Sequence, residues 1–156
     1  MNFEEAYRTR MGIMPVLGAY IKAVIYDQGL EKALEYNRTA ANLDAERILS
    51  IYPIPDEPIT PQDAASILGM HEESGMKSVI EIVGNEVQNN TTKCVYYDGW
   101  HSAGIEPAVI EQLCRDRFEI FGEMVWKKFN PSIVAELRKF KEHSDGLCLE
   151  VIKFTE

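Results

Sequence analysis

Long apolar runs are absent from the sequence. The longest apolar segment, Met11 to Tyr26, is interrupted by Pro15, Gly18 and Lys22, whereas a helix that crosses a membrane needs about 18 or more apolar residues in succession. The opening letters MNFEEAYRTRMG do not place a basic region before an apolar one, which is the pattern of a secretory signal. We therefore expect neither a membrane partner nor a secretory leader.

Cysteine is scarce, and no two cysteines lie close together in the sequence. Cys94, Cys114 and Cys148 are the three in the chain, and an odd number with wide spacing does not predict a disulfide framework. Free thiols are typical of a reducing compartment, so we expect a cytoplasmic protein.

Positive charge is in deficit. The chain carries 16 basic residues against 25 acidic ones, which gives a formal net charge of −9. Because affinity for nucleic acid depends on Lys and Arg contacts with phosphates, this balance predicts no nucleic-acid partner. The sequence also has no glycine-rich phosphate loop, dinucleotide-binding fingerprint or Cys-x-x-Cys pair, which argues against nucleotide-dependent chemistry.

The sequence does contain enough apolar material for a core, and we expect a single domain over residues 1–156. The chain is 46% hydrophobic, and a domain of this length can bury a substantial core. Residues 1–75 are predicted to be mainly helical, because apolar residues recur at helical spacing on both sides of Gly29. Four prolines between Pro53 and Pro61 indicate a turn-rich connection. Thr60-Pro61 is then a typical helix start, with the helix ending near Gly69.

Residues 76–156 add the β signals. β-branched and aromatic residues predict strands at 78–83 and 91–97, joined by a turn at Asn89-Asn90. A loop over 98–101 precedes a long helix that starts at Pro107, a second helix is expected from Asn130-Pro131 through Phe140, and a strand is expected over 147–154. The predicted fold class is α+β: N-terminal helices, an antiparallel β-hairpin, two helices and a C-terminal strand forming a small helix-covered antiparallel sheet.

Seven residues of the second half form a loose candidate site. Each cysteine lies on a different predicted element, so the fold could bring the thiols together. Three interpretations stay open: small core residues, ligands of zinc or iron, or a reactive site. The candidates are Cys94, Trp100, His101, Cys114, Asp116, Cys148 and Glu150.

The two chemical interpretations make different demands. Three thiolates and His101 would be a known zinc set, although the chain lacks the closely spaced ligand pair of structural zinc sites. A nucleophilic thiol instead needs a nearby cation, which Arg115, Arg117 or His101 could supply. Strand alternation places Glu150 on the same face as Cys148.

The three histidines are expected to have different roles. Trp100 and His101 fall in the loop after Asp98-Gly99, where binding residues concentrate, and are expected at the rim of a site. His71 at a helix end would complement the helix dipole as a cation. His143 lies in a polar connection and is expected to have no chemical role.

The second half resembles a known family. The segments DGWHSAG, LCRDRFEIF, FNPSIVAEL and DGLCLEVIKF, with the ordered Cys94, Cys114, Asp116, Gly146 and Cys148, resemble the L-2-amino-thiazoline-4-carboxylic acid hydrolase-like proteins over residues 77–154. That group is in turn similar to 4-vinyl reductase-type small-molecule-binding domains. The resemblance implies a helix-covered antiparallel sheet with a ligand pocket, opening of a thiazoline ring, and Cys114, Asp116 and Cys148 at or near the site.

Two functions follow as expectations. The first is a hydrolase acting on a cyclic C–N bond, with Cys114, Asp116 and Cys148 catalytic and Cys94, Trp100, His101 and Glu150 binding the substrate. The second is a non-catalytic domain that binds an apolar molecule or a tetrapyrrole, suggested by the aromatic residues Tyr96, Tyr97, Trp100, Phe118, Phe121 and Trp126. Whether the chain is an enzyme, and whether two copies pair through the N-terminal helices, stays open.

Overall fold

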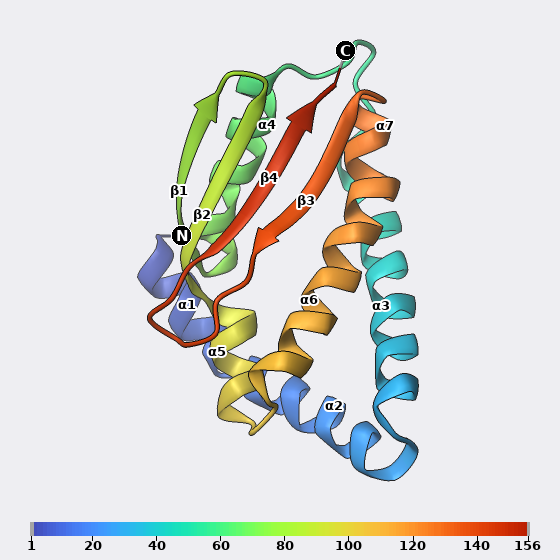
Figure 1. Ribbon diagram of the computed structural model, residues 1–156, viewed down its shortest axis with the longest axis vertical. Coiled ribbons are helices and arrows are strands. Elements are labelled where there is room, and N and C mark those ends of the chain that lie inside the picture. The colour runs from blue at the N-terminus through green and yellow to red at the C-terminus, as the bar shows by residue number, and fades with distance from the viewer. Residues whose placement is uncertain (1, 156) are drawn as a thin grey trace.

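A four-stranded antiparallel sheet lies against a group of helices in the computed structural model, which describes residues 2–155 (Figure 1). This confirms the predicted α+β class with a helix-covered antiparallel sheet. The elements are α1 (Phe3–Met11), α2 (Met14–Gln28), α3 (Leu30–Ile51), α4 (Pro61–Gly69), η1 (Met70–Ser74), β1 (Met76–Val83), β2 (Glu86–Cys94), α5 (Val95–Ser102), α6 (Pro107–Phe121), η2 (Gly122–Trp126), α7 (Lys127–Phe129), β3 (Ile133–Lys139) and β4 (Cys148–Phe154).

Local signals account for the first half. The break predicted at Gly29 separates α2 from α3, and this glycine adopts a φ of +90°, which glycine tolerates readily. Thr60 caps α4 as predicted: its side chain accepts a hydrogen bond from the Asp63 backbone, and the Asp63 carboxylate accepts one from the Thr60 backbone.

In the part of the chain that the structure describes, no helix is long and apolar enough to cross a membrane.

The predicted hairpin exists, but its turn was placed wrongly. The chain reverses at Gly84-Asn85, with Val83 paired to Glu86, whereas Asn89 and Asn90 lie in the middle of β2. Gly84 has a φ of +61°, and a glycine at positive φ is what a two-residue hairpin loop favours. The predicted strand at 91–97 also ends early, at Cys94.

The segment after Cys94 is helical where a strand end and then a loop were expected. Tyr96, Tyr97 and the whole of Asp98 to His101 belong to α5. Trp100 is therefore buried as part of a helix, and the same helix leaves His101 exposed.

The second helix predicted after Asn130-Pro131 is wrong, because the chain forms strand β3 there. Ile133, Ala135 and Leu137 alternate with outward-facing residues and pair with β4. The spacing of Val134, Leu137 and Phe140 also fits a helix, so the local pattern was ambiguous. Pairing with β4, which supplies a ladder of backbone hydrogen bonds, decides the outcome.

The strand order is β1-β2-β4-β3, so the last strand of the chain lies inside the sheet. α4 covers β1 and β2, and α6 and η2 contact β3 (Figure 1). The opposite face carries exposed residues such as Val79, Glu81 and Glu136. One face of the sheet, called the inner face below, is thus packed against helices.

The helix after Pro107 was predicted correctly but contains one irregular turn. Between α6 and α7, the residues Gly122–Trp126 form a π-helical turn. Val125 and Trp126 in this turn are buried, and Gly122 lies against β3, where an added Cβ would be 3.1 Å from the Cβ of Ala135. The turn thus brings the end of the long helix close to the sheet.

The buried apolar residues fall into two clusters. The first includes Leu68, Val87 and Ile152 and lies between α3, α4, the sheet and the end of the long helix. The second includes Met14, Trp100 and Leu113 and lies between α2, α5 and α6.

Candidate functional site

The three predicted thiols lie on three different elements, and two of them pack against the same apolar cluster. Cys94 ends β2, Cys114 lies in α6 and Cys148 begins β4. Burial is the main cause that raises the pKa of Cys114 well above its usual value. Cys94 and Cys114 both pack against the second apolar cluster, and Cys148 lies opposite Thr91 at the start of β4.

The same burial keeps these groups in the thiol form at neutral pH. Burial raises the pKa of Cys94 to about 11, although backbone hydrogen bonds from Tyr97 and Tyr96 oppose the shift. The pKa of Cys148 is also raised, again mainly by burial. Since the thiolate is the nucleophile and the metal ligand, the environment does not activate any of the three.

The predicted metal ligands do not form a compact set. Within residues 2–155, no three His, Cys, Asp or Glu side chains are close enough together to hold a metal ion. His101 is exposed on α5, and its ring stacks on Tyr97 with ring centroids 5.6 Å apart.

The remaining predicted residues are spread over different parts of the fold. Asp116 forms an ion pair with Arg38 at 2.7 Å and lines a small surface cavity between α3 and α6. Glu150 is half-buried on the inner face of the sheet and accepts a hydrogen bond from the side chain of Asn89. Trp100 is buried and lines a larger pocket.

That pocket is the candidate functional site. It has a volume of about 550 Å³ and lies between α2, α3, α5 and α6. Its walls are mostly apolar, and several of its residues, such as Ile13 and Tyr20, are exposed, so it opens to the surface. The lining residues are Arg10, Ile13, Met14, Leu17, Tyr20, Ile21, Val24, Ala33, Tyr36, Asn37, Ala40, Tyr96, Trp100 and Arg117.

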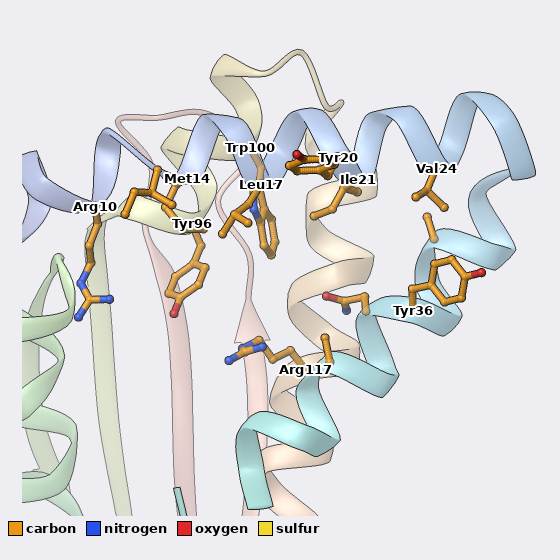
Figure 2. A pocket seen from close by; sticks show the side chains of 14 residues that line it. Arg10, Met14, Leu17, Tyr20, Ile21, Val24, Tyr36, Tyr96, Trp100 and Arg117 are labelled. Carbon is orange, nitrogen blue, oxygen red and sulfur yellow. The ribbon is translucent and has the colours of Figure 1, made fainter. Parts of the chain in front are cut away.

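The pocket has two chemically different ends. Figure 2 shows Arg10 and Tyr96 toward one end, Arg117 below the middle, and Val24 and Tyr36 toward the other end. The lining contains two arginines and no acidic residue. Both charged residues of the lining are thus cationic, although Arg117 also pairs with Asp44 outside the lining.

Arg117 is held by several contacts. Its guanidinium forms an ion pair with Asp44 on α3 and lies over the rings of Phe121 and Tyr96, at 5.0 Å and 5.8 Å from their centroids. A guanidinium has five N–H donors in a fixed plane, so one carboxylate partner leaves donors available for another acceptor.

Two other donors of the pocket differ in how they are satisfied. Among the described residues, the side chain of Arg10 donates one hydrogen bond, to the backbone carbonyl of Glu73 at 3.4 Å. The indole Nε1 of Trp100 is buried, and no residue of the described range accepts its hydrogen bond. A buried donor without a partner is costly unless a ligand or water completes it.

Two glycines allow α2 and α5 to pack closely together where both helices line the pocket, and this contact is called the pocket roof below. A Cβ at Gly18 would lie 2.8 Å from the Cβ of Ala103 and 3.1 Å from the Cα of Trp100. A Cβ at Gly99 would lie 2.3 Å from the Cβ of Met14. The close approach of the two helices therefore requires glycine on both sides.

No family model, curated protein or solved structure matches this chain. The resemblance to the thiazoline hydrolase-like proteins therefore stays a prediction.

The sequence interpretation identified only part of the pocket. Tyr96 and Trp100 were named for their aromatic character and Arg117 as a cation, whereas Arg10, Asn37 and the α2 residues were missed. One signal was present: the stretch Met11 to Ile21 contains no charged residue. A helix apolar on more than one side can pack against a neighbour and also line a cavity.

Proposed function

We propose that this protein binds a small amphipathic molecule that has an apolar body and an acidic group. The observation that carries the proposal is the pocket of about 550 Å³, with apolar walls, two arginines and no acidic lining residue. Ligand sites are commonly cavities of roughly this size, with apolar walls and a few polar groups that fix orientation. The proposal is a more specific form of the second function expected from the sequence, a non-catalytic domain that binds an apolar molecule or a tetrapyrrole.

The chemistry of the lining suggests how the ligand would be oriented. Its apolar body would lie between α2 and α3 along Leu17, Ile21 and Val24, where burial of apolar surface favours binding. Its acidic group would face Arg117 and Arg10, because a guanidinium donates short charge-assisted hydrogen bonds to a carboxylate.

Paired probes can test this orientation. Decanoate and 1-decanol have the same chain but differ in charge, and each can be titrated against an anionic fluorophore bound in the pocket, 8-anilinonaphthalene-1-sulfonate. Arg117→Met should weaken decanoate binding about tenfold and leave decanol binding nearly unchanged. Arg115→Met is the matched control, because Arg115 contacts Glu111 and the Leu137 carbonyl and does not line the pocket.

Two outcomes would contradict the proposal. Failure of both probes to displace the fluorophore would rule out an amphipath-binding pocket. Equal losses of decanoate affinity in the Arg117 and Arg115 variants would rule out the role of Arg117. If neither outcome is observed, native mass spectrometry of protein purified from cells can identify a co-purified natural ligand, and a panel of lipids and tetrapyrroles can be tested for binding.

Hydrolysis of a thiazoline-type C–N bond is the second candidate function. Its support is that Cys148 and Glu150 face the same side of β4 as predicted, and that Cys94 and Cys114 pack against the same apolar cluster. Because the thiol pKa values are raised, a thiolate-dependent rate should increase with pH well above neutrality. The measurement is ring opening of 2-amino-thiazoline-4-carboxylate. Full turnover in a variant with all three cysteines replaced by serine would exclude a catalytic thiol.

A cytoplasmic location and pairing of two copies through the N-terminal helices also remain proposals. The pairing is supported by the exposed apolar side chains of Ile13, Val16 and Tyr20, which lie at helical spacing on or beside α2.

A further inference from the structure

The inner face of the sheet contains polar residues where a continuous apolar core would be expected. Along β2, Val87 belongs to the first apolar cluster and Val95, just beyond the strand, belongs to the second. Between them, Asn89 and Thr91 point to the same inner face and are buried. Asn89 pairs with Glu150 across the sheet, so polar groups on two strands separate the two clusters. This set, called the polar layer below, consists of His71, Ser78, Asn89, Thr91 and Glu150.

Hydrogen bonds fix the orientation of Asn89. Its Nδ2 donates to Oε2 of Glu150 at 2.8 Å and lies 3.4 Å from Nδ1 of His71. The reverse orientation would place the amide oxygen against the Glu150 carboxylate, which is unfavourable. Nearby, the hydroxyls of Ser78 and Thr91 are 2.9 Å apart and satisfy one another.

This orientation leaves an acceptor without a donor. Asn89 is fully buried, and its Oδ1 has no hydrogen-bond partner among residues 2–155. Buried polar atoms without partners are rare in folded proteins and indicate a missing water, ion or ligand.

The charge of the layer is also unmatched. In the described part of the chain, Glu150 forms no ion pair with a lysine or an arginine. Burial lowers the pKa of His71, although the neighbouring Glu150 opposes the shift, so the imidazole is neutral at neutral pH. The layer therefore presents a carboxylate and an amide oxygen, and it holds no cation that balances them.

We propose that the polar layer is a binding site for the protonated nitrogen of a small organic cation, an amine or an amidine. Such a group carries both the positive charge that the Glu150 carboxylate lacks and the N–H donors that Asn89 Oδ1 lacks. None of the residues of the layer lines the pocket between α2 and α3. The site is thus distinct from the one proposed for an acidic amphipath, and its chemistry is the opposite.

Acetamidinium chloride is a suitable probe, and neutral acetamide of similar shape is its control. In heteronuclear NMR spectra, acetamidinium should shift the side-chain amide signals of Asn89 in a saturable way at millimolar concentration. It should also lower the pKa of His71 measured by titration, because a bound cation cancels the effect of Glu150. Acetamide should produce neither effect.

Two matched substitutions locate the interaction. Glu150→Gln keeps the shape of the side chain but removes its charge, and it should weaken acetamidinium binding about tenfold or more. Glu81→Gln is the control, because Glu81 lies exposed on the opposite face of the sheet, and it should leave binding unchanged. Arg117→Met should also have no effect, which separates this test from that of the pocket.

Four results would overturn the proposal. The first three are no saturable shift in the wild-type protein, equal binding by the Glu150→Gln variant, and equal binding of acetamide, which would mean that the layer holds water or any polar molecule. The fourth is an unchanged pKa of His71. The titration of His71 uses only wild-type protein, so an unchanged pKa in the presence of acetamidinium overturns the proposal even if Glu150→Gln does not fold.

Discussion

His71 is the one histidine of the described range that the fold largely encloses, since His101 and His143 are exposed. The sequence suggested a cation that complements a helix end. The structure instead places His71 in η1 beside Asn89 and Glu150, where burial lowers its pKa. Its position next to a helix end was visible in the sequence, but its enclosure depends on strands that pair far along the chain.

A lowered histidine pKa makes stability depend on pH with a definite sign. The unfolded chain takes up a proton near its ordinary pKa of about 6.5, whereas the folded protein takes it up only at lower pH. The contribution of His71 to the free energy of unfolding should therefore be complete above about pH 6.5. Below that pH the free energy of unfolding should decrease, by at most about 1.4 kcal/mol per pH unit from this group.

Urea denaturation at pH 7, 6 and 5 tests this prediction. His71→Asn should reduce the loss of stability between pH 7 and 5, while His143→Asn, on an exposed loop, should leave it unchanged. An identical pH dependence in the wild-type protein and the His71 variant would show that another group is responsible.

At the scale of elements, the crossing of α2 and α5 determines the position of the pocket roof. Gly18→Ala would place a methyl group 2.8 Å from the Cβ of Ala103 and 3.1 Å from the backbone of Trp100. We expect the two helices to separate, with a loss of about 1–3 kcal/mol in the free energy of unfolding and weaker binding of amphipathic probes.

Gly69→Ala is the matched control, measured by the same urea denaturation. Gly69 lies at the end of α4 with helical dihedral angles, and nothing lies within 4 Å of an added Cβ. Because alanine favours the helical conformation, this variant should be unchanged or more stable by about 0.5–1 kcal/mol. A Gly18 variant as stable as this control would mean that the helix crossing tolerates a side chain.

The elements also show what sequence could and could not predict. The breaks at Gly29 and Gly69, the cap at Thr60 and the helix start at Pro107 depend on a few adjacent residues and were predicted correctly. The turn of the hairpin was misplaced even though Gly84-Asn85 is itself a local turn signal. The identity of β3, by contrast, depends on pairing with β4, about 15 residues away along the chain. Asparagine in mid-strand was unexpected because its role lies in the polar layer.

The candidate site shows the same difference between features that depend on neighbouring residues and features that depend on distant ones. Alternation correctly placed Cys148 and Glu150 on one face, because that requires only a strand. The pocket combines α2, α3, α5 and α6, and no local pattern indicates which helices will meet. Arg10 and Asn37 could not be singled out for this reason.

At the scale of the whole molecule, the polar layer divides what could have been one core. Replacing both Asn89 and Glu150 by leucine would remove the unpaired oxygen and the carboxylate together, and would join the two apolar clusters. We expect the double variant to be more stable than the wild type by about 1–2 kcal/mol, because well-packed apolar groups often replace buried polar ones favourably.

Asn89→Leu alone should have the opposite effect, since it leaves the Glu150 carboxylate without its donor, at a cost of about 1–3 kcal/mol. Urea denaturation of the single and double variants measures this coupling. If the double variant is also less stable than the wild type, the polar layer contributes to the stability of the fold and needs no ligand to explain its polar residues.

The π-helical turn at Gly122–Trp126 has a consequence for the length of the chain. Such a turn accommodates one residue more than an α-helical turn. Deleting one residue there would restore a regular α-helical turn, and the residues beyond it would keep nearly the same orientation, because the π-turn absorbs the extra residue locally. Deleting one residue from the regular turns of α6 would instead rotate everything beyond it by about 100°. Phe129 would then leave the core, and Asn130 would lose its hydrogen bond with the Ile59 carbonyl. The π-turn is thus a place where the length of the chain can change by one residue while the end of the helix and the beginning of β3 stay in phase with the sheet.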